Sequence, residues 1–225
     1  MIGARRFRQD AGFTVAEFLV AITIFGVILA AVAGFFVTAT KSFSLNQSVG
    51  TNSKTASNGM NEISRILRAA TENPVSGQAL NDPAFTTATP ESVTVYAYVN
   101  LASSAEQPVK VTFSVDVNRN LIETKYNAYA LSPGYWGFST SASSTRNLGG
   151  KVVTQTGSNP SLFTYLGVDN QPLPIPSGGY TTGNLRSIAA VRVTLTLSAT
   201  AAGNSSNVTL QNTVGMPNLP LSRSL

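Results

Sequence analysis

The chain has 225 residues, which is enough for one domain of ordinary size and an additional segment. It contains no cysteine and no histidine, which excludes disulfides, thiolate metal sites and histidine general bases. Only 11% of the residues are charged, against roughly 25% in ordinary soluble domains, and the net charge is +5. Arg5, Arg6 and Arg8 lie close together, but no basic run follows, so the clustered charge of a nucleic-acid-binding surface is missing.

The first long feature is an uncharged and mostly apolar stretch from Phe18 to Thr40. About 20 such residues cross a bilayer as a helix, and the arginines before them predict that the N-terminus stays cytoplasmic. A cleaved secretory signal would have a shorter apolar core of about 7–15 residues. A simple signal anchor leaves Glu17 unexplained, because a carboxylate in the membrane is costly unless it is neutralised or paired. The simpler alternative for Glu17 is hydration near the headgroups.

The residues before this stretch, AGFTVAE at positions 11–17, resemble the processing and assembly motif of type IV prepilins and pseudopilins. In that family a short basic leader is cut after a glycine, so the resemblance assigns the cut to the bond between Gly12 and Phe13. It also implies that Phe13 becomes the N-methylated first residue of the mature chain. Thr14 would then be the second mature residue and Glu17 the fifth, where the family carries its assembly glutamate.

The resemblance gives Glu17 a physical role. The carboxylate of one subunit can pair with the α-amino group that cleavage creates on Phe13 of a neighbour, and the pair removes two buried-charge penalties together. We therefore expect Glu17→Ala to insert into the membrane but to stay out of the fibre.

Small residues at four-residue spacing follow within the apolar stretch, at Gly26, Ala30 and Gly34. They share one face of a helix and would let another helix approach closely. The alternative is that glycine and alanine are simply frequent in membrane helices.

After Lys41 the sequence becomes polar, and no proline occurs before Pro74. The residue before a proline avoids the helical region, so we expect one helix from about residue 13 to about residue 71. One face of its second half should pack on a globular domain, with Arg65 and Arg68 in solvent. The apolar or small residues at helical spacing are Val49, Ala56, Met60, Ile63, Ile66, Leu67 and Ala70.

The rest of the chain shows the period of two that is typical of strands. Antiparallel pairs with short loops predict a sheet with one face on the amphipathic helix, an α+β, pilin-like fold. The segment 132–161 is rich in Gly, Ser, Thr and Asn and is expected to be a loop or a weak strand. The expected strands cover residues 92–99, 109–117, 121–126, 191–197 and 207–214, the last two paired across a turn at 202–206.

Four groups of residues resemble ligand or catalytic sites, and we expect none to be one. The oxygen atoms of 169–171 and the glycines of 149–151 are expected in turns, because a calcium site needs 6–8 oxygen ligands and a phosphate loop needs a longer motif. Aromatic residues crowd positions 126–138 and are expected to pack, with ligand stacking as the alternative. Asp116 and Glu123 could meet across a hairpin but are expected in solvent beside Lys110 and Lys125. No metal, cofactor or catalytic residue is predicted.

The expected organisation is a cleaved leader (1–12), a transmembrane and assembly half-helix (13–40), an amphipathic half-helix (41–72) and an extracytoplasmic β-rich domain (73–225). The resemblance implies a non-enzymatic subunit of a type IV pilus, type II secretion or DNA-uptake filament. Looser similarities at 63–70, 163–173 and 186–197 point to a minor, J-type subunit. The expected location is the cytoplasmic membrane and then a periplasmic or cell-surface filament.

The implied partners are a prepilin peptidase, other pilin subunits, an inner-membrane assembly platform and membrane lipid. Nucleic acid stays open as a partner without support. The alternative function is a pilin-anchored adhesin or ligand-binding module for DNA or glycan. A membrane-anchored hydrolase is disfavoured by the missing histidine and cysteine.

Overall fold

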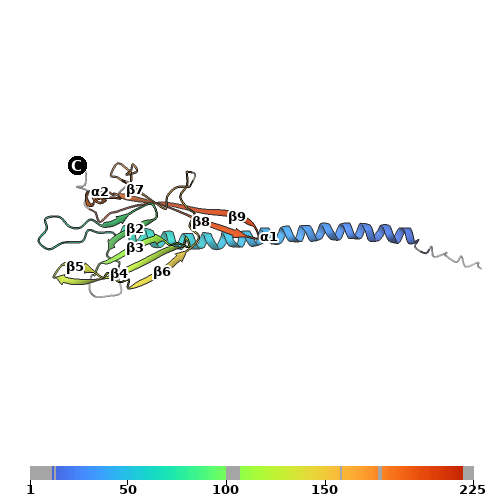
Figure 1. Cartoon of the computed structure of the whole chain (residues 1–225), viewed down its shortest axis with the longest axis horizontal. Coiled ribbons are helices and arrows are strands. Elements are labelled where there is room, and N and C mark those ends of the chain that lie inside the picture. Colours follow the sequence, from blue (N-terminus) through green and yellow to red (C-terminus); the bar gives the residue numbers. More distant parts are fainter. Residues whose placement is uncertain (1–11, 13, 100–106, 158, 177–178, 220–225) are drawn as a thin grey trace, which may run out of the picture. The chain divides into compact units, whose positions relative to one another are not determined.

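The computed structural model describes residues 12, 14–99, 107–157, 159–176 and 179–219. The chain divides into two compact units, Met1–Ser44 and Leu45–Leu225. Helix α1, Val15–Arg68, begins in the first unit and ends in the second (Figure 1). These bounds lie within three residues of the helix predicted from the sequence.

In the first unit, every side chain of α1 is exposed from residue 15 to residue 43. Among the described helices, α1 alone is long and apolar enough to cross a membrane, with a mean hydropathy of 2.7 over its most apolar window. None of that window is buried by other parts of the chain. A helix that is apolar on all sides needs lipid or other helices around it.

The second unit contains two antiparallel sheets, whereas the sequence predicted one. In the first sheet, β1 to β5 pair in chain order, and β6 pairs with β4. In the second, β8 lies between β7 and β9. The first sheet consists of β1 Phe85–Ala88, β2 Ser92–Ala97, β3 Val109–Val115, β4 Leu121–Ser132, β5 Tyr135–Phe138 and β6 Ser144–Gly149. The second consists of β7 Phe163–Leu166, β8 Ala190–Ala201 and β9 Asn204–Gly215, and the short helix α2, Thr182–Arg186, lies between β7 and β8 in the chain.

The hairpin of β8 and β9 is longer than predicted and has a tighter turn. Ala201 pairs with Asn204, so the turn consists of Ala202 and Gly203 alone. Both have positive φ, 53° and 83°, which is the geometry of a two-residue turn that matches strand twist. The predicted turn at 202–206 was therefore too long, because residues 204–206 belong to β9.

The second half of α1 contacts both sheets and contributes its buried face to the core. At Gly59 a side chain would meet Leu121 of β4 at 3.4 Å and Leu195 of β8 at 3.5 Å, so this glycine lets both sheets approach the helix. Val49 was expected on the buried face but is only partly buried. The buried residues of this half are Ala56, Gly59, Met60, Ile63, Ser64, Ile66 and Leu67.

Candidate processing and assembly site

The first turn of α1 is closed by reciprocal hydrogen bonds between Thr14 and Glu17. The backbone N–H of Glu17 donates to Thr14 Oγ1 at 3.2 Å. In return, Glu17 Oε2 accepts from the backbone N–H of Thr14 at 2.9 Å and from its hydroxyl at 3.0 Å. This is a capping box, which satisfies two of the N–H groups that a helix leaves unpaired at its start.

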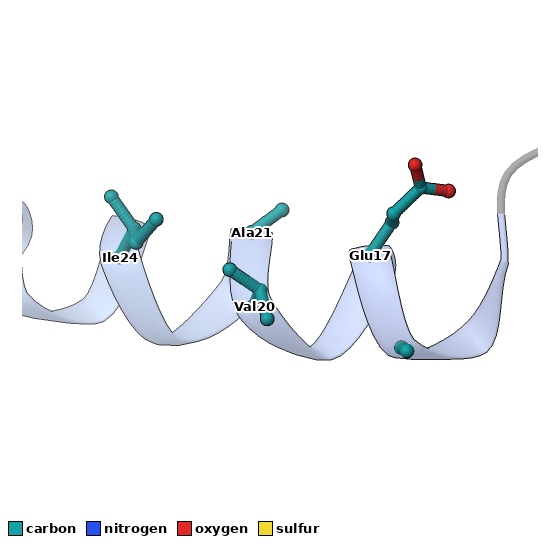
Figure 2. Close-up of a pocket in the computed structure, with 5 residues that line it drawn as sticks. Glu17, Val20, Ala21 and Ile24 are labelled. Carbon is teal, nitrogen blue, oxygen red and sulfur yellow. The ribbon is translucent and has the colours of Figure 1, made fainter.

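A shallow groove runs along the helix from this turn. Figure 2 shows the carboxylate of Glu17 extending away from the backbone at one end of the groove, with Val20, Ala21 and Ile24 along the next two turns. Ala16 completes the lining, and apart from the carboxylate the surface is apolar. The groove therefore offers a helical partner an apolar contact beside one acidic group.

The other predicted site residues lie on either side of this turn. Gly12 is exposed, and Phe13 lies outside the described residues. Gly26 and Gly34 have no heavy atom within 4 Å of the position that a side chain would take. The face that they share with Ala30 is therefore open to a partner, and its use in helix packing stays a prediction.

The turn predicted at 169–171 is present. The backbone N–H of Gln171 donates to Asp169 Oδ1 at 3.0 Å, which closes an Asx turn around Asn170 at φ 60°. Gly149 ends β6 rather than forming a phosphate loop. Within the described ranges, no group of three or more acidic side chains is close enough together to hold a metal ion.

The aromatic residues between 126 and 138 make several packing contacts. Phe138 stacks on Tyr96 of β2 with 4.6 Å between ring centroids, and Lys110 Nζ lies 4.5 Å from the centroid of Tyr126. Tyr129 covers the backbone of Gly137, its partner across β4 and β5, and remains 54% exposed. These residues form β5 and part of β4. Of the segment 132–161, which was expected to be a loop or a weak strand, residues 135–138 and 144–149 are strands.

The prediction that Glu123 faces solvent is wrong. Its side chain is 2% exposed, because Leu121 and Glu123 share the face of β4 that packs towards α1. Asp116 instead lies in the turn between β3 and β4, where its carboxylate accepts from the backbone N–H groups of Asn118 and Asn120. The two carboxylates therefore do not form an acid pair.

Sequence reasoning also missed the capping role of Thr14, although the signal was present. The pattern Thr-x-x-Glu immediately before an apolar run marks a helix start. The family motif drew attention to the same residues for a different reason. The structure adds that the acid assigned to assembly also closes the first turn of its own helix.

Comparison with known protein families gives a match near the N-terminus. Residues 7–33 match the prokaryotic N-terminal methylation motif. No curated protein matches the chain. The matched residues contain Arg8, Gly12, the capping turn and the first part of the exposed apolar helix. The long helix followed by antiparallel sheets gives the chain a pilin-like architecture. The chain therefore carries the N-terminal motif that is characteristic of type IV prepilins and pseudopilins, together with the long apolar helix that follows this motif.

Proposed function

We propose that the chain is a structural subunit, a minor pilin or pseudopilin, of a type IV pilus, type II secretion or DNA-uptake filament. The observation that carries this proposal is the methylation motif, whose residues continue into an exposed, apolar helix. In this role the chain is the substrate of a prepilin peptidase and catalyses nothing itself. Its partners are the other filament subunits and the assembly platform of the inner membrane.

The proposed route begins with the chain in the cytoplasmic membrane, its basic leader on the cytoplasmic side. The three arginines of the leader favour this orientation. Cleavage between Gly12 and Phe13 then removes the leader and creates a positively charged α-amino group, which is methylated. The domain beyond the apolar half of α1 lies outside the membrane throughout.

The geometry of Glu17 supports its proposed pairing with the new amino group of a neighbour. Among the described residues, both hydrogen bonds from Thr14 reach Oε2, so Oε1 remains available to a second partner. Glu17 can thus cap its own helix and, at the same time, neutralise the α-amino group of a neighbouring subunit. The open face at Gly26, Ala30 and Gly34 would let the helices of adjacent subunits come close.

Intact mass and N-terminal sequencing of protein from membranes test this function. The mature chain should begin at Phe13 and carry one additional methyl group. A chain that keeps Arg5, Arg6 and Arg8 in a strain with an active prepilin peptidase would contradict the proposal. A Gly12→Val variant serves as the uncleaved reference for mass and gel mobility.

The second candidate is a pilin-anchored ligand-binding module. The exposed ring of Tyr129, in a stretch without charged residues from 126 to 145, is the feature that favours it. Binding of DNA and of glycans to purified filaments separates the two functions, because a Tyr129→Ala variant should lose this binding only if the chain is a ligand-binding module.

A further inference from the structure

Five charged side chains meet where the second half of α1 packs on β4 and β6. Helix α1 contributes Glu62 and Arg65, β4 contributes Glu123 and Lys125, and β6 contributes Arg146. All five belong to the second compact unit. Two carboxylates therefore lie together within one contact between helix and sheet.

The hydrogen-bond donors of this cluster are shared unequally. Glu62 accepts from Arg65 at both oxygens, at 2.7 Å and 3.0 Å, and from Arg146 Nη2 at 2.8 Å. Glu123 accepts only at Oε2, where Arg146 Nε and Nη2 lie 2.9 Å and 2.7 Å away. The side chain of Arg146 thus bridges the two acids and brings their carboxyl groups together.

The second oxygen of Glu123 is the unusual atom. Oε1 is buried, and no donor among the described residues forms a hydrogen bond to it. Lys125 Nζ is 3.4 Å away, which is an ion-pair contact only. An ionised carboxylate with such an oxygen would carry a costly desolvation penalty. A proton on Glu123 removes the charge and supplies a donor. Arg146 Nη2 lies 2.7 Å from Glu123 Oε2 and 2.8 Å from Glu62 Oε1, so it holds the Glu62 carboxylate beside Glu123 as an acceptor.

We propose that Glu62 and Glu123 share one proton at pH values where an ordinary glutamate is ionised, and that Glu123 carries it. This proton stabilises the contact of α1 with β4 and β6. Release of the proton to water converts the Glu123 carboxyl to a carboxylate. That step removes the hydrogen bond and places a second negative charge beside Glu62. The contact between helix and sheet therefore loosens as the pH rises.

The pKa directions of the two acids agree with this division. Burial, followed by the hydrogen bond with Glu62, raises the pKa of Glu123, although Lys125 and Arg146 act against the rise. The hydrogen bond from Arg65 lowers the pKa of Glu62 to about 2. Opposite shifts in a contacting pair are expected when one proton serves two carboxyl groups.

Strand β3, on the other side of Glu123, brings no further titratable group to the pair. On β3 the residue opposite Glu123 is Phe113, and the charged residue of that strand, Lys110, lies over Tyr126. The chain also lacks histidine and cysteine, whose ordinary pKa values lie near neutrality. If every side chain kept its ordinary pKa, a chain of this composition would titrate only at its α-amino group between about pH 5 and about pH 8.

The sign of the pH dependence follows from the raised pKa of Glu123. The proton stabilises the folded state fully below the ordinary glutamate pKa of about 4.3. This stabilisation is lost as the pH rises through the folded-state pKa of Glu123. Each tenfold change in the folded-to-unfolded ratio moves a urea midpoint by about 0.5–1.4 M in a small domain.

Urea unfolding of the full chain in detergent tests the proposal, with fluorescence of the single tryptophan, Trp136, as the signal. The midpoint of the wild type should fall between about pH 5 and pH 8. Glu123→Gln, which cannot titrate but can still donate to Glu62, should keep nearly the same midpoint at both pH values. The matched control is Glu91→Gln on the partly exposed ion pair with Arg119, which should lower the midpoint equally at both pH values.

An equal fall in wild type and Glu123→Gln would overturn the proposal, as would a flat wild-type profile. Infrared spectroscopy of the unaltered protein gives a reading that does not depend on the variant folding. A carboxylic-acid carbonyl band should persist above the pH at which exposed acids have ionised, and should vanish at higher pH. Loss of the whole band together with the exposed acids would also overturn the proposal.

Discussion

Glu17 Oε2 accepts two hydrogen bonds from Thr14, one from the backbone N–H at 2.9 Å and one from the hydroxyl at 3.0 Å. The carboxylate assigned to filament assembly is therefore held at the start of its helix before any partner arrives. Two contributions of this side chain have to be separated by experiment: the cap, worth about 1 kcal/mol, and the charge.

Glu17→Gln separates them, because glutamine can complete a capping box but carries no charge. We expect Glu17→Gln and Glu17→Ala to reach the membrane at wild-type levels and to be absent from filaments. Breaking one partner of a buried ion pair costs about 3–5 kcal/mol, which exceeds the value of the cap. Immunoblots of sheared filaments and of membranes measure the two pools. If Glu17→Gln enters filaments normally, the cap is the requirement and the pairing hypothesis is wrong.

The start of α1 could be predicted from the sequence because several local signals agree there. Thr14 and Glu17 form the capping pattern, and the apolar run follows directly. Strands with strict alternation, such as the one that begins at Val109, were also predictable to within two residues. Local patterns determine such elements regardless of the remainder of the chain.

The burial of Glu123 could not be predicted in this way. Alternation along β4 places Leu121, Glu123 and Lys125 on one face and Ile122 and Thr124 on the other. Both faces begin with a large apolar residue, so the pattern does not say which one meets α1. Its cationic partner Arg146 comes from β6, and Glu62, which shares Arg146, comes from α1, so both lie far away in the chain. The second sheet was missed for the same reason, since pairing between distant strands leaves no local signal.

Gly149 provides a test of the packing between β6 and α1. Its φ is 131°, and a side chain there would overlap Cγ2 of Thr55. We expect Gly149→Ala to lower the free energy of unfolding by about 1–3 kcal/mol, because it adds both backbone strain and overpacking. Urea unfolding measures the loss.

Two further variants separate these causes. Gly215→Ala adds a side chain in open space and should change stability little. Adding Thr55→Ser to Gly149→Ala removes the overlapping methyl group and should recover part of the loss, while the backbone strain remains. No recovery would show that the overlap with Thr55 contributes nothing.

Arg119 joins three segments of the second unit through its guanidinium group. Two nitrogens donate to the carboxylate of Glu91, both at 2.8 Å, and Nε donates to the carbonyl oxygen of Val152 at 3.0 Å. We expect Arg119→Lys to lower the free energy of unfolding by about 1–2 kcal/mol, because an ammonium group cannot make this forked contact. Glu91→Gln should cost less, since the pair is partly exposed and the bond to Val152 remains. Equal stability of Arg119→Lys and wild type would contradict this account.

The acid side of the stability profile should depend on Glu62. Its pKa is lowered to about 2, first by the hydrogen bond from Arg65, so ionised Glu62 stabilises the fold above its ordinary pKa of about 4.3. This stabilisation is lost as the pH falls towards 2. Because Glu91 and Asp116 also have lowered pKa values, the wild type alone cannot isolate the effect.

The difference between wild type and Glu62→Gln isolates it. We expect the two urea midpoints to converge as the pH falls from about 5 to about 2, since both chains then lack the charge at position 62. An Arg65→Met variant should move the convergence to higher pH, because it removes the largest cause of the lowered pKa. A constant difference down to about pH 2 would mean that Glu62 gains nothing from Arg65 on folding. Together with the opposite titration of Glu123, the cluster should make stability greatest at a mildly acidic pH, between the two titrations.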